Sequence, residues 1–267
     1  MTTSIDFGAI RSTPVACVDV GGTKVAVSVA DRRGLRGQVT EPTAKEGAND
    51  ALARQVVRMV EQSCSAAGLA STDLTAVGVA SCGPFALKDG MVELSQPNIC
   101  GGLAGPARGL PNDWKTAILE APLRQAFASP TCKVRVENDG MAALEAERRW
   151  GALQGVDHCA YVTWSTGVGV GLCVDGRVLR GKNGNAGHAG HMFVSDDEES
   201  LCGCGNHGDV EALIAGNAMA RRFAAQGYAD AARLFKAASA GDATAAALVD
   251  EACRVLGRML YELVIVL

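Results

Sequence analysis

Two glycine-rich turns in the chain have residue types that suit phosphate binding. The first runs from Asp19 to Lys24 and the second from Ser165 to Gly171. Closely spaced glycines let backbone N–H groups approach an anion, Thr23 adds a hydroxyl donor, and Asp19 could hold a metal-bound water. A single turn of this kind is as often an ordinary hairpin. One such turn in each half of the chain fits a clamp on a polyphosphate, so the pair favours nucleotide binding.

A third motif, Glu-Asn-Asp-Gly at residues 137–140, contains a carboxylate that could act as a catalytic base. It follows a predicted strand and precedes a predicted helix, and a carboxylate at the C-terminal tip of a strand faces the cleft of an α/β fold. Phosphoryl transfer to an alcohol needs a base within hydrogen-bond reach of the hydroxyl. Asp139 suits that role, with Asn138 as an adjacent donor and acceptor. The alternative is that Asp139 only caps the helix that follows.

A fourth motif has the residue types of a zinc site. His191 ends a Gly-His-Ala-Gly-His sequence, and Cys202 and Cys204 follow it one residue apart. Zinc binds imidazole and thiolate ligands, and Asp209 could supply a fourth, oxygen ligand. Closed coordination by four protein groups would make the site structural. The alternative is a reduced glycine–cysteine loop with surface histidines.

The hydrophobic pattern predicts the elements that must hold these motifs. A helix is expected from Asn49 or Asp50 to about Cys64, a second one over residues 142–150, and mostly helical structure over residues 210–267. Residues 81–114 look loop-rich. The apolar stripe of the first helix is Leu52, Val56, Val57 and Val60. The predicted strands are residues 15–20, 25–29, 74–80, 134–137, 160–164 and 168–174, with a short run at 178–179.

The repeated pattern of strand, glycine turn and strand indicates two related α/β lobes. We expect an N-terminal lobe over residues 1–120 and a C-terminal lobe over residues 121–267, with the boundary between residues 110 and 130. The apolar segment 256–267 is followed by no closing element, so we expect the second lobe to be short or truncated.

Composition limits the class of protein. The 267 residues are 48% hydrophobic and 20% charged with a net charge of −4, which gives no basic face for nucleic acid. A membrane-spanning helix needs about 20 consecutive apolar residues, and no segment comes close to that length. The N-terminus also lacks the long apolar region of a secretory signal peptide. We therefore expect a cytoplasmic protein with reduced thiols. Seven of the ten cysteines lie in or beside apolar runs and are expected to be buried: Cys17, Cys64, Cys82, Cys132, Cys159, Cys173 and Cys253.

In this order and spacing, the four motifs resemble the ROK family (repressors, open reading frames and sugar kinases). The resemblance runs from Val15 to about Gly216, and residues 137–147 and 163–211 are its most specific parts. It implies an α/β protein with the two-lobed actin-like ATPase (ribonuclease H-like) fold and a central cleft. It also implies an ATP-dependent hexose kinase, and a homodimer is the expected assembly.

The resemblance also assigns roles to single residues. Asp139 becomes the catalytic base, and Mg²⁺ bridges the ATP phosphates near Asp19. Zinc is held by His191, Cys202 and Cys204. The sugar-binding residues would be Asn98, Asn138, His188, His191 and Glu211. The nucleotide-binding residues would be Asp19, Gly21, Gly22, Thr23, Lys24, Ser165, Thr166 and Gly167.

The sequence departs from the family pattern at three places. Asp209 stands where a third zinc cysteine is usual, which puts zinc binding in doubt. His188 replaces a sugar-binding glutamate and, with Ser165, resembles the family's N-acetylmannosamine kinases more than its glucokinases. A neutral imidazole donates and accepts one hydrogen bond each, whereas a carboxylate only accepts, so an N-acetyl group could suit this site. The family's glycine-rich adenine wall does not appear before Leu267, which puts ATP affinity in doubt.

Two other functions are weighed against the kinase. A transcriptional repressor of this family needs a helix-turn-helix ahead of the first glycine motif, and only a short leader precedes Asp19. A catalytically silent sugar-binding protein would follow if the adenine wall is missing. The kinase on N-acetylmannosamine, glucose or a related hexose remains the prediction.

Overall fold

The structure, a computed structural model, describes residues 13–104 and 109–267 in two compact units. The first unit holds the chain up to residue 142 together with residues 146–154 and 180–185. The second holds residues 143–145, 155–179 and 186–267. The expected boundary at residue 120 therefore lies inside the first unit.

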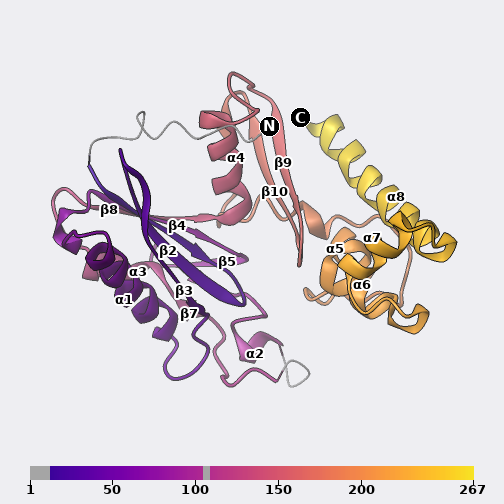
Figure 1. Cartoon of the computed structure of the whole chain (residues 1–267), viewed down its shortest axis with the longest axis horizontal. Coiled ribbons are helices and arrows are strands. Elements are labelled where there is room, and N and C mark those ends of the chain that lie inside the picture. Colours follow the sequence, from indigo (N-terminus) through magenta and orange to yellow (C-terminus); the bar gives the residue numbers. More distant parts are fainter. Residues whose placement is uncertain (1–12, 105–108) are drawn as a thin grey trace. The chain divides into compact units, whose positions relative to one another are not determined.

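A five-stranded sheet forms the centre of the first unit, in the order β3-β2-β1-β4-β8 (Figure 1). β1 pairs antiparallel with β2 and β2 with β3, whereas β4 and β8 run parallel to β1. The pairing of β8 with β4 explains why the first unit extends past residue 120. The strands are β1 Val15–Val20, β2 Lys24–Asp31, β3 Gly34–Pro42, β4 Ala76–Ser81 and β8 Lys133–Asn138.

Two helices, α1 (Ala51–Ala66) and α3 (Glu120–Ala126), pack against each other and on this sheet (Figure 1). Of the predicted stripe on α1, Leu52, Val56 and Val60 are fully buried, while Val57 is only partly buried. Asp50 precedes the helix as predicted, but its side chain makes no capping hydrogen bond. It pairs instead with Arg54, one turn along, at 2.7 Å.

The segment 81–114, expected to be loop-rich, contains regular structure. β5 (Phe85–Lys88) and β6 (Met91–Leu94) form a hairpin, and β7 (Ala117–Ile118) extends it to three strands. A short helix, α2 (Gly101–Ala104), lies between β6 and β7 in the chain. Asp89 and Gly90 both have positive φ at the hairpin turn, as an Asp-Gly type I′ turn requires. That dipeptide was a hairpin signal in the sequence.

The second unit combines a small sheet with helices. β10 (Val168–Val174) pairs with β9 (Cys159–Trp164) and β11 (Arg177–Val178), which confirms the second glycine-turned hairpin. The C-terminal region is helical as predicted: α5 Val210–Ile214, α6 Gly216–Arg222, α7 Ala231–Ser239 and α8 Ala243–Val266. α4 (Asp139–Trp150) begins three residues earlier than predicted and contributes to both units. Short 3₁₀ turns cover Ser71–Asp73, Ala189–His191 and Ala224–Gln226.

All ten cysteines are free thiols. Cys253 was expected to be buried but is exposed. It follows Ala252, whose side chain is buried in the apolar face of α8, and one residue along a helix turns the side chain by about 100°. Among the described residues, no helix combines the length and the apolar character that crossing a membrane would take.

Asn112 provides a test of how the first unit is held together. Its Oδ1 accepts from the amides of Gly101 (2.8 Å) and Trp114 (3.1 Å). Its Nδ2 donates to the carbonyls of Lys45 (2.7 Å) and Ile99 (2.9 Å). One side chain thus joins three segments of the chain.

Asn112→Ala should lower the free energy of unfolding by about 2–3 kcal/mol in urea denaturation, because it leaves several backbone groups without partners. Asp113→Ala, at the exposed neighbouring position, is the control and should change it by less than about 0.5 kcal/mol. Equal stability of the two variants would show that this side chain does not tie the segments together.

Candidate active site

The parallel pairing of β1, β4 and β8 brings the carboxyl ends of three strands to one edge of the first sheet. In the register of these strands Val20 lies beside Ser81, and Ser81 beside Asn138. The glycine turn follows β1, and Asp139 follows β8, at this same edge. In open α/β sheets this is the edge at which ligands bind.

The first glycine turn is closed by a hydrogen bond from the Gly21 amide to the Lys24 carbonyl at 2.9 Å. Thr43 holds it from the next strand, because its Oγ1 donates to the Gly21 carbonyl at 2.7 Å. Thr23 and Lys24 are exposed at its tip. The backbone of the turn is thus fixed by hydrogen bonds while its tip is exposed.

Asn98, predicted to bind sugar, lies against this turn. A Cβ placed on Gly22 would stand 3.1 Å from the Cβ of Asn98, so the two residues are in close contact. Gln96 orients the segment: its Oε1 accepts from the Asn98 amide at 2.9 Å, and its Nε2 donates to the Gly83 carbonyl at 2.6 Å. The exposed Asn98 is therefore part of the same edge.

The sequence left open whether Asp139 acts as a base or only caps the helix that follows it. Asn138 is the N-cap of α4, and its Oδ1 accepts from the amides of Gly140 (3.0 Å) and Met141 (3.3 Å). Asp139 is the first helical residue and has an exposed side chain. Its Oδ1 accepts from the adjacent Gly140 amide at 2.9 Å. Asn138, and not Asp139, therefore caps the helix. The side-chain Oδ1 of Asn138 is occupied by this capping.

The edge concentrates negative charge. Partial desolvation and the charge of Asp19 raise the pKa of Asp139, although its hydrogen bond from Gly140 opposes them. Desolvation likewise raises the pKa of Asp19, and Lys24 opposes it. Burial together with Asp139 and Asp19 raises the pKa of Cys82 to about 12, so this thiol stays protonated. Asp139 is thus a stronger base, once ionised, than an ordinary aspartate.

The second glycine turn, between β9 and β10, is fastened to α5. The Ser165 amide donates to the Gly167 carbonyl at 2.9 Å, and the Gly216 amide donates to the Ser165 carbonyl at 2.8 Å. Trp164 Nε1 donates to the Ile214 carbonyl at 2.6 Å. The predicted phosphate-binding residues of this unit therefore occupy a turn with fixed geometry.

A pocket of about 400 Å³ lies beside this turn. Trp164 and Phe235 form one part of it, with their rings edge to face at 5.8 Å between centroids. Ser165, Thr166, Asn217 and Asp230 add polar groups to its lining. The remaining lining residues are Gly216, Met219, Ala231 and Ala232. A pocket with an aromatic wall and a few polar groups suits a small ligand.

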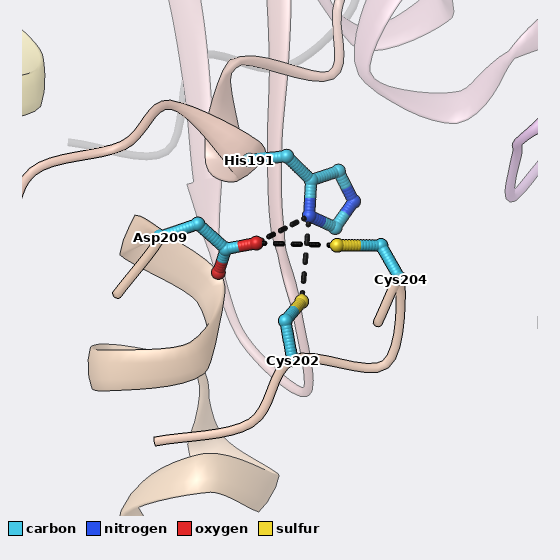
Figure 2. Close-up of side chains that lie close together, drawn as sticks. All are labelled: His191, Cys202, Cys204 and Asp209. Carbon is cyan, nitrogen blue, oxygen red and sulfur yellow. Dashed lines mark hydrogen bonds and ion pairs between the residues drawn. The ribbon is translucent and has the colours of Figure 1, made fainter. Parts of the chain in front are cut away.

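The four predicted zinc ligands point toward one another (Figure 2). Their ligand atoms all lie within 4.8 Å of each other. Asp209 Oδ2 is 3.1 Å from His191 Nδ1 and 3.4 Å from Cys204 Sγ, and Cys202 Sγ is 3.5 Å from His191 Nδ1. One imidazole, two thiols and one carboxylate around a common point form a donor set that fits zinc. The predicted aspartate belongs to it.

Hydrogen bonds inside this cluster shape its protonation. The bond to Asp209 raises the pKa of His191, and the charge of Glu211 adds to it. Burial would raise the pKa of Asp209, but hydrogen bonds from His191 and from the Ala212 amide outweigh it and lower that pKa. Burial raises the pKa of the Cys202 thiol. The cluster thus already contains one ionised oxygen donor.

His188 stacks on His191, with ring centroids 5.9 Å apart and planes 10° apart. Burial, with the neighbouring His191, lowers the pKa of His188 and favours the neutral ring. Its Nε2 is buried and has no hydrogen-bond partner among the described residues. A buried polar atom without a partner is costly unless a ligand or water satisfies it.

The sequence was compared with known proteins. A family model described as "ROK family" matches residues 15–267. This chain belongs to the ROK family. It is 33% identical to an N-acetylmannosamine kinase of Citrobacter koseri, over 92% of this chain and 77% of the relative.

Two solved structures of this family resemble the ROK protein described here. A ROK hexokinase from Thermus thermophilus is 35% identical with a TM-score of 0.72, over 94% of this chain and 78% of the other. A ROK glucokinase from Streptomyces griseus, solved with glucose and AMPPNP, is 29% identical with a TM-score of 0.65, over the same shares, 94% and 78%. They confirm the predicted fold class, the two-lobed actin-like ATPase fold.

The sequence reasoning missed two residues of the ROK protein's first unit. Cys82 follows β4 and so joins Asp19 and Asp139 at the carboxyl edge, but the strand order that puts it there cannot be derived from local pattern. Asn185 accepts from the Phe85 amide and donates to the Phe85 carbonyl, both at 2.8 Å, across 100 residues of sequence. No local signal marks such a contact.

Asp19→Asn should lower the pKa of Asp139, because it removes the like charge that opposes ionisation. Asp139 would then lose its proton at a lower pH. A carboxyl ¹³C NMR titration measures this directly. Asp89→Asn, at the turn between β5 and β6, is the control and should leave the Asp139 titration in place. A pKa of Asp139 that stays constant or rises in Asp19→Asn would contradict the assigned electrostatics.

Cys202→Ser should reduce zinc content and thermal stability together, because a metal bound only by the native state stabilises it. We expect zinc well below one equivalent by elemental analysis and a Tm lower by about 5–10 °C, as 1 kcal/mol corresponds to about 2–4 °C in a chain of this size. Cys253→Ser, at an exposed cysteine of α8, is the matched control. Wild-type zinc content in Cys202→Ser would exclude a metal role for this cluster.

Proposed function

We propose that this ROK-family protein is an ATP-dependent hexose kinase in which Asp139 is the general base. Its relatives with 29–35% identity include a hexokinase, a glucokinase and an N-acetylmannosamine kinase, which supports the class of carbohydrate kinase. The observation that carries the role of Asp139 is its place beside the glycine turn and Asp19, at the carboxyl edge of three parallel strands.

In the proposed reaction, a sugar hydroxyl attacks the γ-phosphorus of ATP, its proton passes to the Asp139 carboxylate, and the bond from the γ-phosphorus to the bridging oxygen breaks as ADP leaves. Such a transfer needs positioning and charge stabilisation more than covalent help from the protein. The raised pKa of Asp139 supports this role, since a base is most effective when its pKa approaches the working pH. Mg²⁺, when bound with ATP, would neutralise phosphate charge, and Asp19 is the carboxylate available near the glycine turn.

The two glycine turns, one in each unit, are the proposed phosphate-binding segments. In the second unit, the turn at Ser165–Gly167 offers its backbone, and the adjoining pocket with Trp164 and Phe235 suits the nucleoside. The Streptomyces griseus relative was solved with AMPPNP, an ATP analogue, which supports ATP as the donor.

The proposed sugar-binding residues are Asn98 and Asn138 in the first unit, and His188, His191 and Glu211 in the second. The unpartnered, buried Nε2 of His188 supports a direct contact to substrate. Imidazole can donate as well as accept, so it can bind a group that a carboxylate would repel. We therefore propose a 2-acetamido hexose such as N-acetylmannosamine as the preferred substrate, with glucose as the competing candidate.

Zinc would be held by His191, Cys202, Cys204 and Asp209, whose donor set fits it. It would supply structural cross-linking of the loop between His191 and α5. His191 contacts Asp209 in this cluster and also stacks on His188. An ordered loop would therefore also hold the ring of His188 in place.

The test is a coupled kinase assay with glucose, mannose, N-acetylglucosamine and N-acetylmannosamine, run on the wild type and on Asp139→Asn. We expect turnover of N-acetylmannosamine, and a loss of about 10²–10⁴-fold in kcat in the variant, because the amide keeps the shape but cannot take the proton. Sugar affinity by calorimetry should remain within about threefold.

Asp113→Asn, an exposed aspartate of the same unit, serves as the control and should retain wild-type turnover. Wild-type rates in Asp139→Asn would refute the base. Absence of turnover with every sugar, together with no ATP binding at millimolar concentration, would favour a catalytically silent sugar-binding protein.

A further inference from the structure

Glu211 lies directly against the second glycine turn. Its Oε2 accepts a hydrogen bond from the Val168 amide at 3.0 Å. A Cβ placed on Gly167 would stand only 2.7 Å from the same oxygen. The carboxylate is therefore packed onto the turn, where it binds one backbone amide and lies in the space that any side chain at residue 167 would need.

α5 holds Glu211 in this place from both ends. At its start, Asp209 is 1% exposed and its Oδ1 caps the helix by accepting from the Ala212 amide at 2.6 Å. At its end, the Ile214 carbonyl accepts from Trp164 Nε1 at 2.6 Å. A helix fixed at both ends leaves the side chain of its second residue little freedom to move away from the turn.

We propose that Glu211 is a positioning residue for the turn formed by residues 165–168, in addition to any contact it makes with sugar. This inference rests on the proposed function, in which that turn binds the phosphates of the nucleotide. By holding the Val168 amide, Glu211 fixes the peptide plane between Gly167 and Val168 and with it the direction of the neighbouring N–H groups. Phosphate and carboxylate repel each other, so the phosphates would bind on the side of the turn away from Glu211.

The dual use of one carboxylate links the two substrates. One oxygen holds the turn, and the other can accept a hydrogen bond from a sugar hydroxyl. A sugar bound to the second oxygen would then contact the residue that holds the turn, so that sugar binding and ATP binding would be coupled. A residue that binds only sugar would not produce this coupling.

The direct test measures hydrogen exchange of the Val168 amide by NMR, expressed as its rate relative to that of the Val170 amide in the same protein. The Val170 amide donates to the Gly187 carbonyl at 3.0 Å and does not contact Glu211, so the ratio removes the effect of any general loss of stability. Glu211→Gln keeps an oxygen acceptor at the same reach, whereas Glu211→Asp is one methylene shorter.

We expect the ratio to stay within about twofold of wild type in Glu211→Gln and to rise by about tenfold or more in Glu211→Asp. Gly167→Ala should raise the ratio as well. Its new methyl group would push the Glu211 carboxylate away from the turn, although residue 211 itself remains a glutamate. Glu262→Asp, at an exposed position of α8, should leave it unchanged. A wild-type ratio in both Glu211→Asp and Gly167→Ala would overturn the positioning role.

The consequence for binding is measured separately, by calorimetry with MgATP. Glu211→Asp should weaken ATP about tenfold, while Glu211→Gln should bind ATP like the wild type and differ in its KM for sugar. If the wild type does not bind ATP, the proposed function fails, yet the exchange ratio still decides whether Glu211 positions the turn. An altered ratio with unchanged ATP affinity would overturn the link to the nucleotide.

Discussion

The parallel pairing of β1, β4 and β8 is the constraint on which the first unit's site depends. Parallel strands start at one edge of a sheet and end at the other, so their C-terminal residues must meet. The register places Val20, Ser81 and Asn138 side by side, and the residues just beyond them provide the glycine turn, Cys82 and Asp139. Segments separated by more than 100 residues thus supply one group of functional side chains without a long loop.

In the second unit the five-residue helix α5 has the corresponding role. Asp209 connects its start to the predicted zinc ligands, and Glu211 connects its first turn to the loop between β9 and β10. A helix this short has little stability of its own, so its position depends on these tertiary contacts. The proposed metal ligands, the proposed sugar-binding Glu211 and the proposed phosphate turn are therefore linked by a few hydrogen bonds.

Local patterns in the sequence predicted both glycine-turned hairpins, α1 and the helical C-terminal region, because each rests on neighbouring residues. The Asp-Gly dipeptide at residues 89–90 is an equally local signal for a hairpin turn. The prediction that residues 81–114 are loop-rich did not take it into account. The C-terminal limit of the first unit could not be predicted from local patterns, because β8 belongs to this unit by pairing with the distant strand β4. Asn138, rather than Asp139, caps α4, a choice between adjacent polar residues that depends on backbone geometry. The four converging ligands were predicted from spacing and residue type alone.

The electrostatics of the carboxyl edge favour a catalytic over a purely structural role for its acids. An aspartate that stabilises a fold usually has a lowered pKa, as Asp31 does beside Arg36 and Asp242 at the start of α8. Asp19 and Asp139 show the opposite direction, and Lys24 only partly offsets the cost for Asp19. Two partly desolvated acids with raised pKa values at one edge reduce stability, and such residues concentrate at functional sites. These shifts support the proposed role of Asp139 as the base and of Asp19 near the bound Mg²⁺.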